Sequence, residues 1–203
     1  MGENGRRMRK FLLLTFIVFS CAKHEAPVAN TYSKAKPQPA TTQTAAAQAT
    51  PAASGQTADV GTTLPPYTAK MIDGKTFDVA AEHGTVVFLN LWATWCGPCR
   101  FEIPELQSMH NKYASRGFKV VGVSLDDTGV EGVKEFVTKN SMTYPIAYDP
   151  DGKIAAILQS SVLPTSVIVD RSGHIVWKRY GAVSMSDPTL TEALTRALDA
   201  PKS

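Results

Sequence analysis

Apolar residues recur along this chain with two different spacings, and together these predict a mixed α/β domain. Two dense runs rich in β-branched, leucine and aromatic residues, 85–93 and 118–126, are typical of strands buried on both faces. A polar turn at Arg171–Gly173 divides 165–180 into two further strands. An Asp-Gly turn between short apolar stretches predicts a hairpin within 67–80.

Helices are expected between these strands. Apolar residues three or four positions apart, with polar residues opposite, predict four helices at 98–116, 129–140, 153–159 and 187–200. In the last of them, Asp187 is placed to cap the first turn and Pro188 to begin it. The order strand, helix, strand, helix, hairpin, helix predicts an α/β domain with a mixed central sheet.

The first 60 residues follow a different pattern. Cationic residues within 6–10 precede an apolar run at 11–20, as in a signal peptide, which we place at 1–20. Ten helical residues cover only about half of a hydrocarbon core, which disfavours a transmembrane anchor. Residues 21–60 are mostly Ala, Thr, Gln and Pro and are expected to form a disordered linker. The folded domain is then expected at 61–203.

The apolar run ends in "VFSC", where a small residue precedes Cys21. This stretch resembles the lipobox of bacterial lipoproteins, in which the cysteine becomes the lipidated N-terminus. The resemblance implies that Cys21 carries a lipid anchor and that the protein lies on the periplasmic side of a bacterial membrane, outside the cytoplasm. The alternative is a plain secretory signal with an incidental cysteine.

The net charge of +3 arises in the leader and linker. Residues 1–60 hold 7 Lys and Arg against 3 Asp and Glu, whereas 61–203 hold 14 against 15. A near-neutral domain lacks the basic footprint of a nucleic-acid-binding protein, so we expect no nucleic-acid partner. We expect a monomer.

The candidate chemistry lies in "WATWCGPC", where a predicted strand ends and a predicted helix begins. Cys96 therefore falls at a helix N-terminus, where free N–H groups and the helix dipole stabilise a thiolate. Gly97 and Pro98 keep the turn short and bring Cys99 one helical turn later, on the same side. We expect the first sulfur to be exposed and reactive and the second to lie beneath it.

Three roles are open to such a pair. A structural zinc site needs four ligands, but there is no second cysteine pair, and His83 and His110 do not flank the turn as ligands would. A permanent disulfide with a two-residue spacer closes almost no loop and would constrain little chain entropy. We therefore favour a reversible redox couple that needs neither metal nor cofactor.

The stretches "NLWATWCGPC" and "VLPT" (162–165) resemble the thioredoxin superfamily and, within it, the TlpA/ResA-like thiol–disulfide oxidoreductases. The resemblance covers 60–200 and implies a thioredoxin-like three-layer fold with a mixed central sheet, an N-terminal β-hairpin and a central insert at 144–162. It also implies a cis Pro164 beside the disulfide. Leu163 would offer its backbone to an extended substrate strand, and Thr165 would join the same binding surface.

The sequence also supports predictions for Trp95 and Glu102. Trp95 is expected to cap the active-site surface, with plain packing as the alternative. Cytosolic thioredoxins have a buried Asp where this chain has Asn90, which cannot take a proton. Glu102 matches an acidic residue of the ResA-like group, so we expect it near the cysteines as the proton carrier. The alternative is a solvated residue in the first turn of the helix.

The resemblance implies reduction of disulfides in partner proteins, such as apocytochrome c or copper-site proteins, with a membrane thiol reductase as electron donor. The same residues could instead serve an oxidant that forms disulfides. A thiol peroxidase would need Thr or Ser three residues before Cys96, where the chain has Ala93. A copper chaperone would need a histidine beside the pair, and no clear candidate is present.

Overall fold

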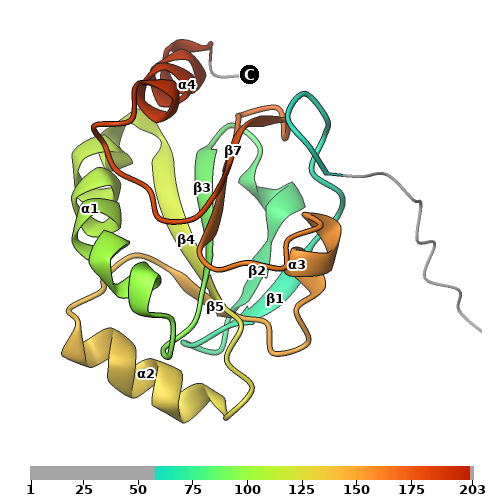
Figure 1. Cartoon of the computed structure of the whole chain (residues 1–203). Helices are drawn as coiled ribbons and strands as arrows, with labels where there is room; N and C mark the ends of the chain where they lie inside the picture. The colour runs from blue at the N-terminus through green and yellow to red at the C-terminus, as the bar shows by residue number, and fades with distance from the viewer. Residues whose placement is uncertain (1–57, 202–203) are drawn as a thin grey trace, which may run out of the picture. The chain divides into compact units, whose positions relative to one another are not determined.

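The computed structural model describes residues 58–201 (Figure 1). The predicted signal peptide, Cys21 and nearly all of the predicted linker lie outside this range. Within 58–201, none of the helices combines the length and the apolar character needed to cross a bilayer.

One mixed sheet of seven strands organises the domain. The strands are β1 (Thr68–Met71), β2 (Thr76–Asp78), β3 (Val86–Trp92), β4 (Phe118–Ser124), β5 (Ile146–Tyr148), β6 (Thr165–Val169) and β7 (Ile175–Tyr180). Their spatial order is β2-β1-β5-β4-β3-β6-β7. β3, β4 and β5 run parallel, and the other pairings are antiparallel. The predicted mixed sheet and N-terminal hairpin are therefore confirmed.

β3 lies in the interior of this sheet, as its sequence predicts. All seven of its residues are buried, and each pairs with a residue of β4, from Val86 with Phe118 to Trp92 with Ser124. Because the two strands are parallel, their carboxyl ends meet at the same edge of the sheet. That edge carries the segment with the two cysteines.

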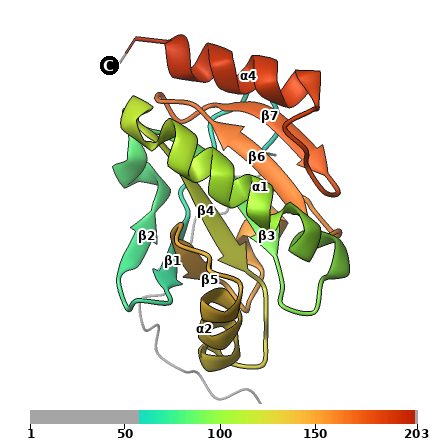
Figure 2. The ribbon, with the colours of Figure 1, turned by 90° about the vertical axis from the view of Figure 1, so that its left-hand side faces the viewer.

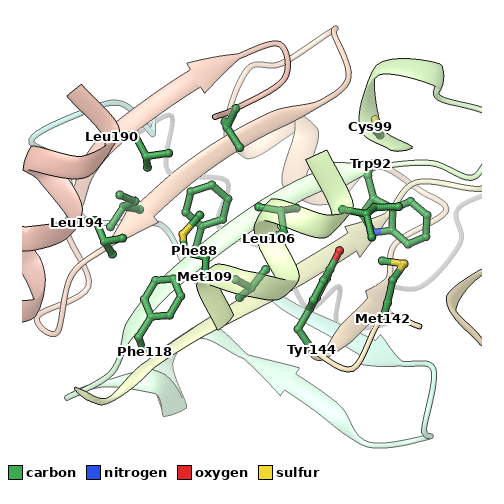
Figure 3. Close-up of a cluster of buried hydrophobic side chains, with 14 of the residues drawn as sticks. Phe88, Trp92, Cys99, Leu106, Met109, Phe118, Met142, Tyr144, Leu190 and Leu194 are labelled. Atoms are coloured by element: carbon green, nitrogen blue, oxygen red, sulfur yellow. The ribbon is translucent and has the colours of Figure 1, made fainter. Parts of the chain in front are cut away.

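Helices cover both faces of the sheet and give the expected three layers. The helices are α1 (Gly97–Tyr113), α2 (Val130–Lys139), α3 (Lys153–Ile157) and α4 (Pro188–Asp199). α1, α2 and α4 lie on one face, and α3 lies on the other (Figures 1 and 2). Each face has its own apolar core. On the α1 side, Phe88 packs with Leu106 and Leu190 (Figure 3).

Some element ends differ from the sequence-based expectation. The helix predicted to reach residue 116 ends as an α-helix at Tyr113 and continues as the short 3-10 helix η2 (Ala114–Arg116). Gly117 then closes it in the left-handed region, at φ 74°, which glycine adopts at little cost. The predicted cap of α4 is confirmed, because the Asp187 side chain accepts a hydrogen bond from the Thr189 N–H.

Candidate active site

Cys96 and Cys99 form a disulfide at the start of α1, with their Cα atoms 5.4 Å apart. Cys96 is the N-cap residue of the helix, and its Sγ accepts a hydrogen bond from the Cys99 N–H at 3.2 Å. Free N–H groups at a helix N-terminus and the positive end of the helix dipole lower the free energy of a thiolate. The predicted placement of Cys96 is thus confirmed.

The expectation that the first sulfur is exposed is wrong for this disulfide-bonded form. Cys96 is only 4% exposed and Cys99 1%, and both belong to the apolar core on the α1 side of the sheet. The cause is the capping geometry, because the Cys96 side chain turns back onto the helix to meet the Cys99 N–H. Cys96 is still the more accessible of the two.

Exposed apolar and small residues border the pair. Trp95 is 67% exposed, so the alternative that it simply packs in the core is wrong. Gly97 and Pro98 are exposed as well. Phe101, two residues after Cys99, is 86% exposed, which the sequence pattern did not predict. The helix therefore begins with an apolar surface next to its redox pair.

The loop before β6 supplies the second landmark. The Leu163–Pro164 peptide bond is cis, as the family resemblance implied. Leu163 is half-buried and packs against the cluster that contains both cysteines. Within residues 58–201, no hydrogen bond engages its backbone N–H or C=O. Thr165 is fully buried and donates to the Val162 carbonyl at 2.8 Å, so the expectation that its side chain joins the binding surface is wrong.

Glu102 lies inside the protein, one turn further along α1 than Cys99. It is 2% exposed, so the alternative of a solvated surface residue is wrong. Its Oε1 accepts from Asn90 Nδ2 at 2.7 Å, and its Oε2 accepts from the Val183 N–H at 2.9 Å. Burial penalises the charged carboxylate and raises its pKa to about 7, although both donors act against the shift.

The hydrogen bonds of Glu102 continue into the sheet. Asn90 Nδ2 also donates to Ser166 Oγ at 3.0 Å, and these two residues face each other across β3 and β6. Ser166 lies two residues after the cis-proline, so the buried acid is linked to that loop as well as to the cysteine-bearing helix. No sequence pattern pointed to Ser166 or to the Val183 backbone. An acid with a pKa close to neutrality can exchange a proton with a nearby thiol at physiological pH.

Trp92 and His174 contact other side chains within the domain. Trp92 is buried, and its ring lies 5.3 Å from that of Phe136. His174 flanks the turn between β6 and β7 and contacts Ser172 Oγ through Nδ1 at 2.9 Å. Across the described range, no three His, Cys, Asp or Glu side chains gather in a way that could hold a metal ion.

Comparisons with known proteins agree with this geometry. The model of the AhpC/TSA family matches residues 60–178. The thiol–disulfide oxidoreductase ResA of a Bacillus cereus strain is 33% identical over 122 residues, which cover 60% of this chain and 70% of ResA.

Solved structures of thiol–disulfide interchange proteins and isomerases also resemble this chain. A putative thiol:disulfide interchange protein DsbE from Chlorobium tepidum superposes with a TM-score of 0.65 and 30% identity, over 70% of this chain and 99% of that one. A secreted thiol–disulfide isomerase from Corynebacterium glutamicum superposes with a TM-score of 0.62 and 29% identity, over 68% and 86% of the two chains. With the family match spanning more than half its length, this chain belongs to the AhpC/TSA family of thioredoxin-like proteins, among the ResA-like thiol–disulfide oxidoreductases.

Proposed function

We propose that this oxidoreductase is tethered to a bacterial membrane outside the cytoplasm and reduces disulfides in partner proteins. Apocytochrome c and copper-site proteins are the candidate substrates. The observation that carries the proposal is the Cys96–Cys99 pair at the N-terminus of α1, one helical turn before the buried Glu102, whose pKa is raised to about 7. The extracytoplasmic location is supported by "VFSC" after the apolar leader and by the secreted relative from Corynebacterium glutamicum.

The reaction is thiol–disulfide exchange in two steps. The Cys96 thiolate attacks one sulfur of a partner disulfide, forms a mixed disulfide, and releases the other partner sulfur as a thiolate. Cys99 then loses its proton and attacks Cys96 Sγ, which expels the second partner sulfur. Two electrons have passed to the partner, which leaves as a dithiol. The enzyme is left with its Cys96–Cys99 disulfide and is reduced again by a membrane thiol reductase, without any cofactor.

The surroundings of the pair suit an extended polypeptide substrate. The Leu163 backbone has a free donor and acceptor among the described residues, which suits pairing with a substrate strand. Trp95, Gly97 and Pro98 provide an exposed surface beside the sulfurs. Thr165 supports this surface from below by fixing the loop through its bond to the Val162 carbonyl.

Glu102 would serve the second step. Cys99 must become a thiolate to attack Cys96, and Glu102 lies on the next turn of the same helix. With a pKa near 7, its carboxylate can accept a proton and its acid form can return one. Asn90 cannot carry a proton but holds Glu102 in place through its 2.7 Å hydrogen bond.

The reducing direction is tested by the reduction potential of the Cys96–Cys99 couple. We expect a value below about −220 mV, nearer to thioredoxin, at about −270 mV, than to the oxidant DsbA, at about −120 mV. The full-length protein can be equilibrated in dithiothreitol redox buffers and its free thiols trapped by alkylation. A potential near that of DsbA would instead support disulfide formation as the function.

A further inference from the structure

Side chains outside the cysteine pair form hydrogen bonds with the turn that precedes Cys96. The Cys96 N–H donates to the Ala93 carbonyl at 3.1 Å, so residues 93–96 form a tight turn between β3 and α1. Thr94 and Trp95 are its two central residues. The shape of this turn determines where Cys96 Sγ lies relative to Cys99.

Asp126 accepts hydrogen bonds from the N–H and the hydroxyl of Thr94 in this turn. The Thr94 N–H lies 3.1 Å from each of its carboxylate oxygens, and Thr94 Oγ1 donates to Oδ1 at 2.6 Å. Oδ2 also accepts from Ser124 Oγ at 2.7 Å. Asp126 is only 1% exposed. A buried carboxylate with this many donors is fixed in position, and charge-assisted hydrogen bonds of this kind are stronger than neutral ones.

Arg100 binds the carbonyl group of Thr94. Its Nε and Nη2 donate to the Thr94 carbonyl at 3.1 and 2.7 Å. The same guanidinium lies over the ring of Phe136 in α2, 5.5 Å from its centroid. The N–H and hydroxyl of Thr94 are thus bound by Asp126, just after β4, and its carbonyl by Arg100, in the first turn of α1.

We propose that Asp126 is a positioning residue for thiol–disulfide exchange, which acts through Thr94 to keep Cys96 Sγ within reach of Cys99. The proposal rests on the exchange reaction proposed above. Closure of the Cys96–Cys99 disulfide is intramolecular, and its rate and equilibrium depend on how well the two sulfurs are aligned. If the turn becomes more mobile, the effective concentration of one sulfur at the other falls. The rate and the equilibrium constant of disulfide closure then fall together.

The test compares Asp126→Ala with Asp127→Ala in the full-length protein. Asp127 is the next residue and is exposed, which makes it a matched control. For Asp126→Ala we expect the equilibrium constant for disulfide closure, measured against dithiothreitol, to fall about threefold or more, and the closure rate to fall about tenfold. Asp127→Ala should match the wild type. If the folded Asp126→Ala variant has the wild-type equilibrium constant and rate, Asp126 has no positioning role and the proposal is overturned, even if the variant is less stable.

If Asp126→Ala does not fold, two more conservative variants can test the positioning role of Asp126. Asp126→Asn retains an oxygen that can accept from Thr94, so it should recover most of the closure rate. Thr94→Val removes the hydroxyl that donates to Asp126 Oδ1 and should by itself lower the closure rate. A folded Thr94→Val variant with the wild-type closure rate would contradict the proposal. Loss of exchange in the wild type itself would instead contradict the proposed function.

Discussion

Among single residues, Glu102 is the buried acid for which we propose the role of proton carrier. Its pKa is raised from 4.5 to about 7, so the folded protein keeps this proton over a pH range in which the unfolded chain loses it. The stabilising contribution of the protonated group is therefore complete below about pH 4.5 and is lost as the pH rises to about 7. Over that range the loss is at most about 3 kcal/mol.

Glu102→Gln should remove this pH dependence, because glutamine does not titrate. We expect the free energy of unfolding, measured by urea denaturation, to change less between pH 4.5 and 7 than in the wild type. Glu135→Gln is the control, since Glu135 is an exposed residue of α2. Glu102→Gln should also lower the apparent pKa of the thiols, because a neighbouring negative charge no longer opposes the thiolate. Unchanged stability and thiol titration curves would show that Glu102 is not the proton carrier.

At the scale of elements, close packing between β4 and its neighbours supports the strand that precedes the cysteines. A Cβ added at Gly122 would lie 2.9 Å from both Trp92 Nε1 and Ile146 Cδ1, closer than side chains can approach. The Trp92 side chain is buried among large apolar side chains and cannot easily move away. Glycine at this position therefore lets β4 pack against the end of β3.

Gly122→Ala should thus lower the free energy of unfolding by about 1–3 kcal/mol, as expected for overpacking in a core. Gly132→Ala is the matched control, because Gly132 lies within α2 and an added Cβ there meets nothing within 4 Å. Alanine is the better helix former, so the control should gain about 0.5–1 kcal/mol. Both values can be read from urea denaturation. Equal effects of the two substitutions would refute the packing argument.

The regular elements could be predicted because their own residues specify them. β3 shows an apolar run that only Asn90 interrupts. α1 begins at Gly97 and Pro98 and then shows apolar residues at helical spacing. The two cysteines were found for the same reason, since their placement depends on adjacent segments alone. The hairpin and the cap of α4 likewise needed only local signals.

Buried charged residues could not be predicted in this way, because distant segments provide their partners. Arg171 is 4% exposed and donates to four carbonyl oxygens in three segments far from it in the sequence: those of Gly84, Arg116, Leu198 and Ala200. The sequence position of Asp126, however, could have indicated that it lies near Cys96. It lies two residues beyond the end of β4, a strand parallel to β3 whose carboxyl end lies at the same edge of the sheet as Cys96.

At the scale of the whole molecule, the point where the chain enters the domain is fixed. Ala58 is buried, and its carbonyl accepts a hydrogen bond from Lys178 Nζ at 3.1 Å. The same ammonium donates to the Leu158 carbonyl at 2.9 Å, so the described domain begins against β7 and the end of α3. A tether attached at Cys21 would therefore join the domain at this fixed point.

We expect Cys21→Ser to move the protein from the membrane fraction to the soluble fraction, because the substitution removes the proposed lipid attachment point. Cys96→Ser is the control and should leave the distribution between the fractions unchanged. Fractionation followed by immunoblotting measures both. If Cys21→Ser remains in the membrane fraction as firmly as the wild type, the lipid anchor is excluded.

The central claim is that Cys96 attacks the partner disulfide and Cys99 resolves the mixed disulfide. Trapping tests it most directly, by incubating reduced full-length variants with insulin as a disulfide-containing probe and locating the new bond by mass spectrometry. Cys99→Ala should accumulate a mixed disulfide at Cys96, whereas Cys96→Ala should accumulate about a tenth as much or less, because Cys99 is the more buried sulfur and lacks the N-cap position. Equal trapping by the two variants, or trapping at Cys99 alone, would contradict the account.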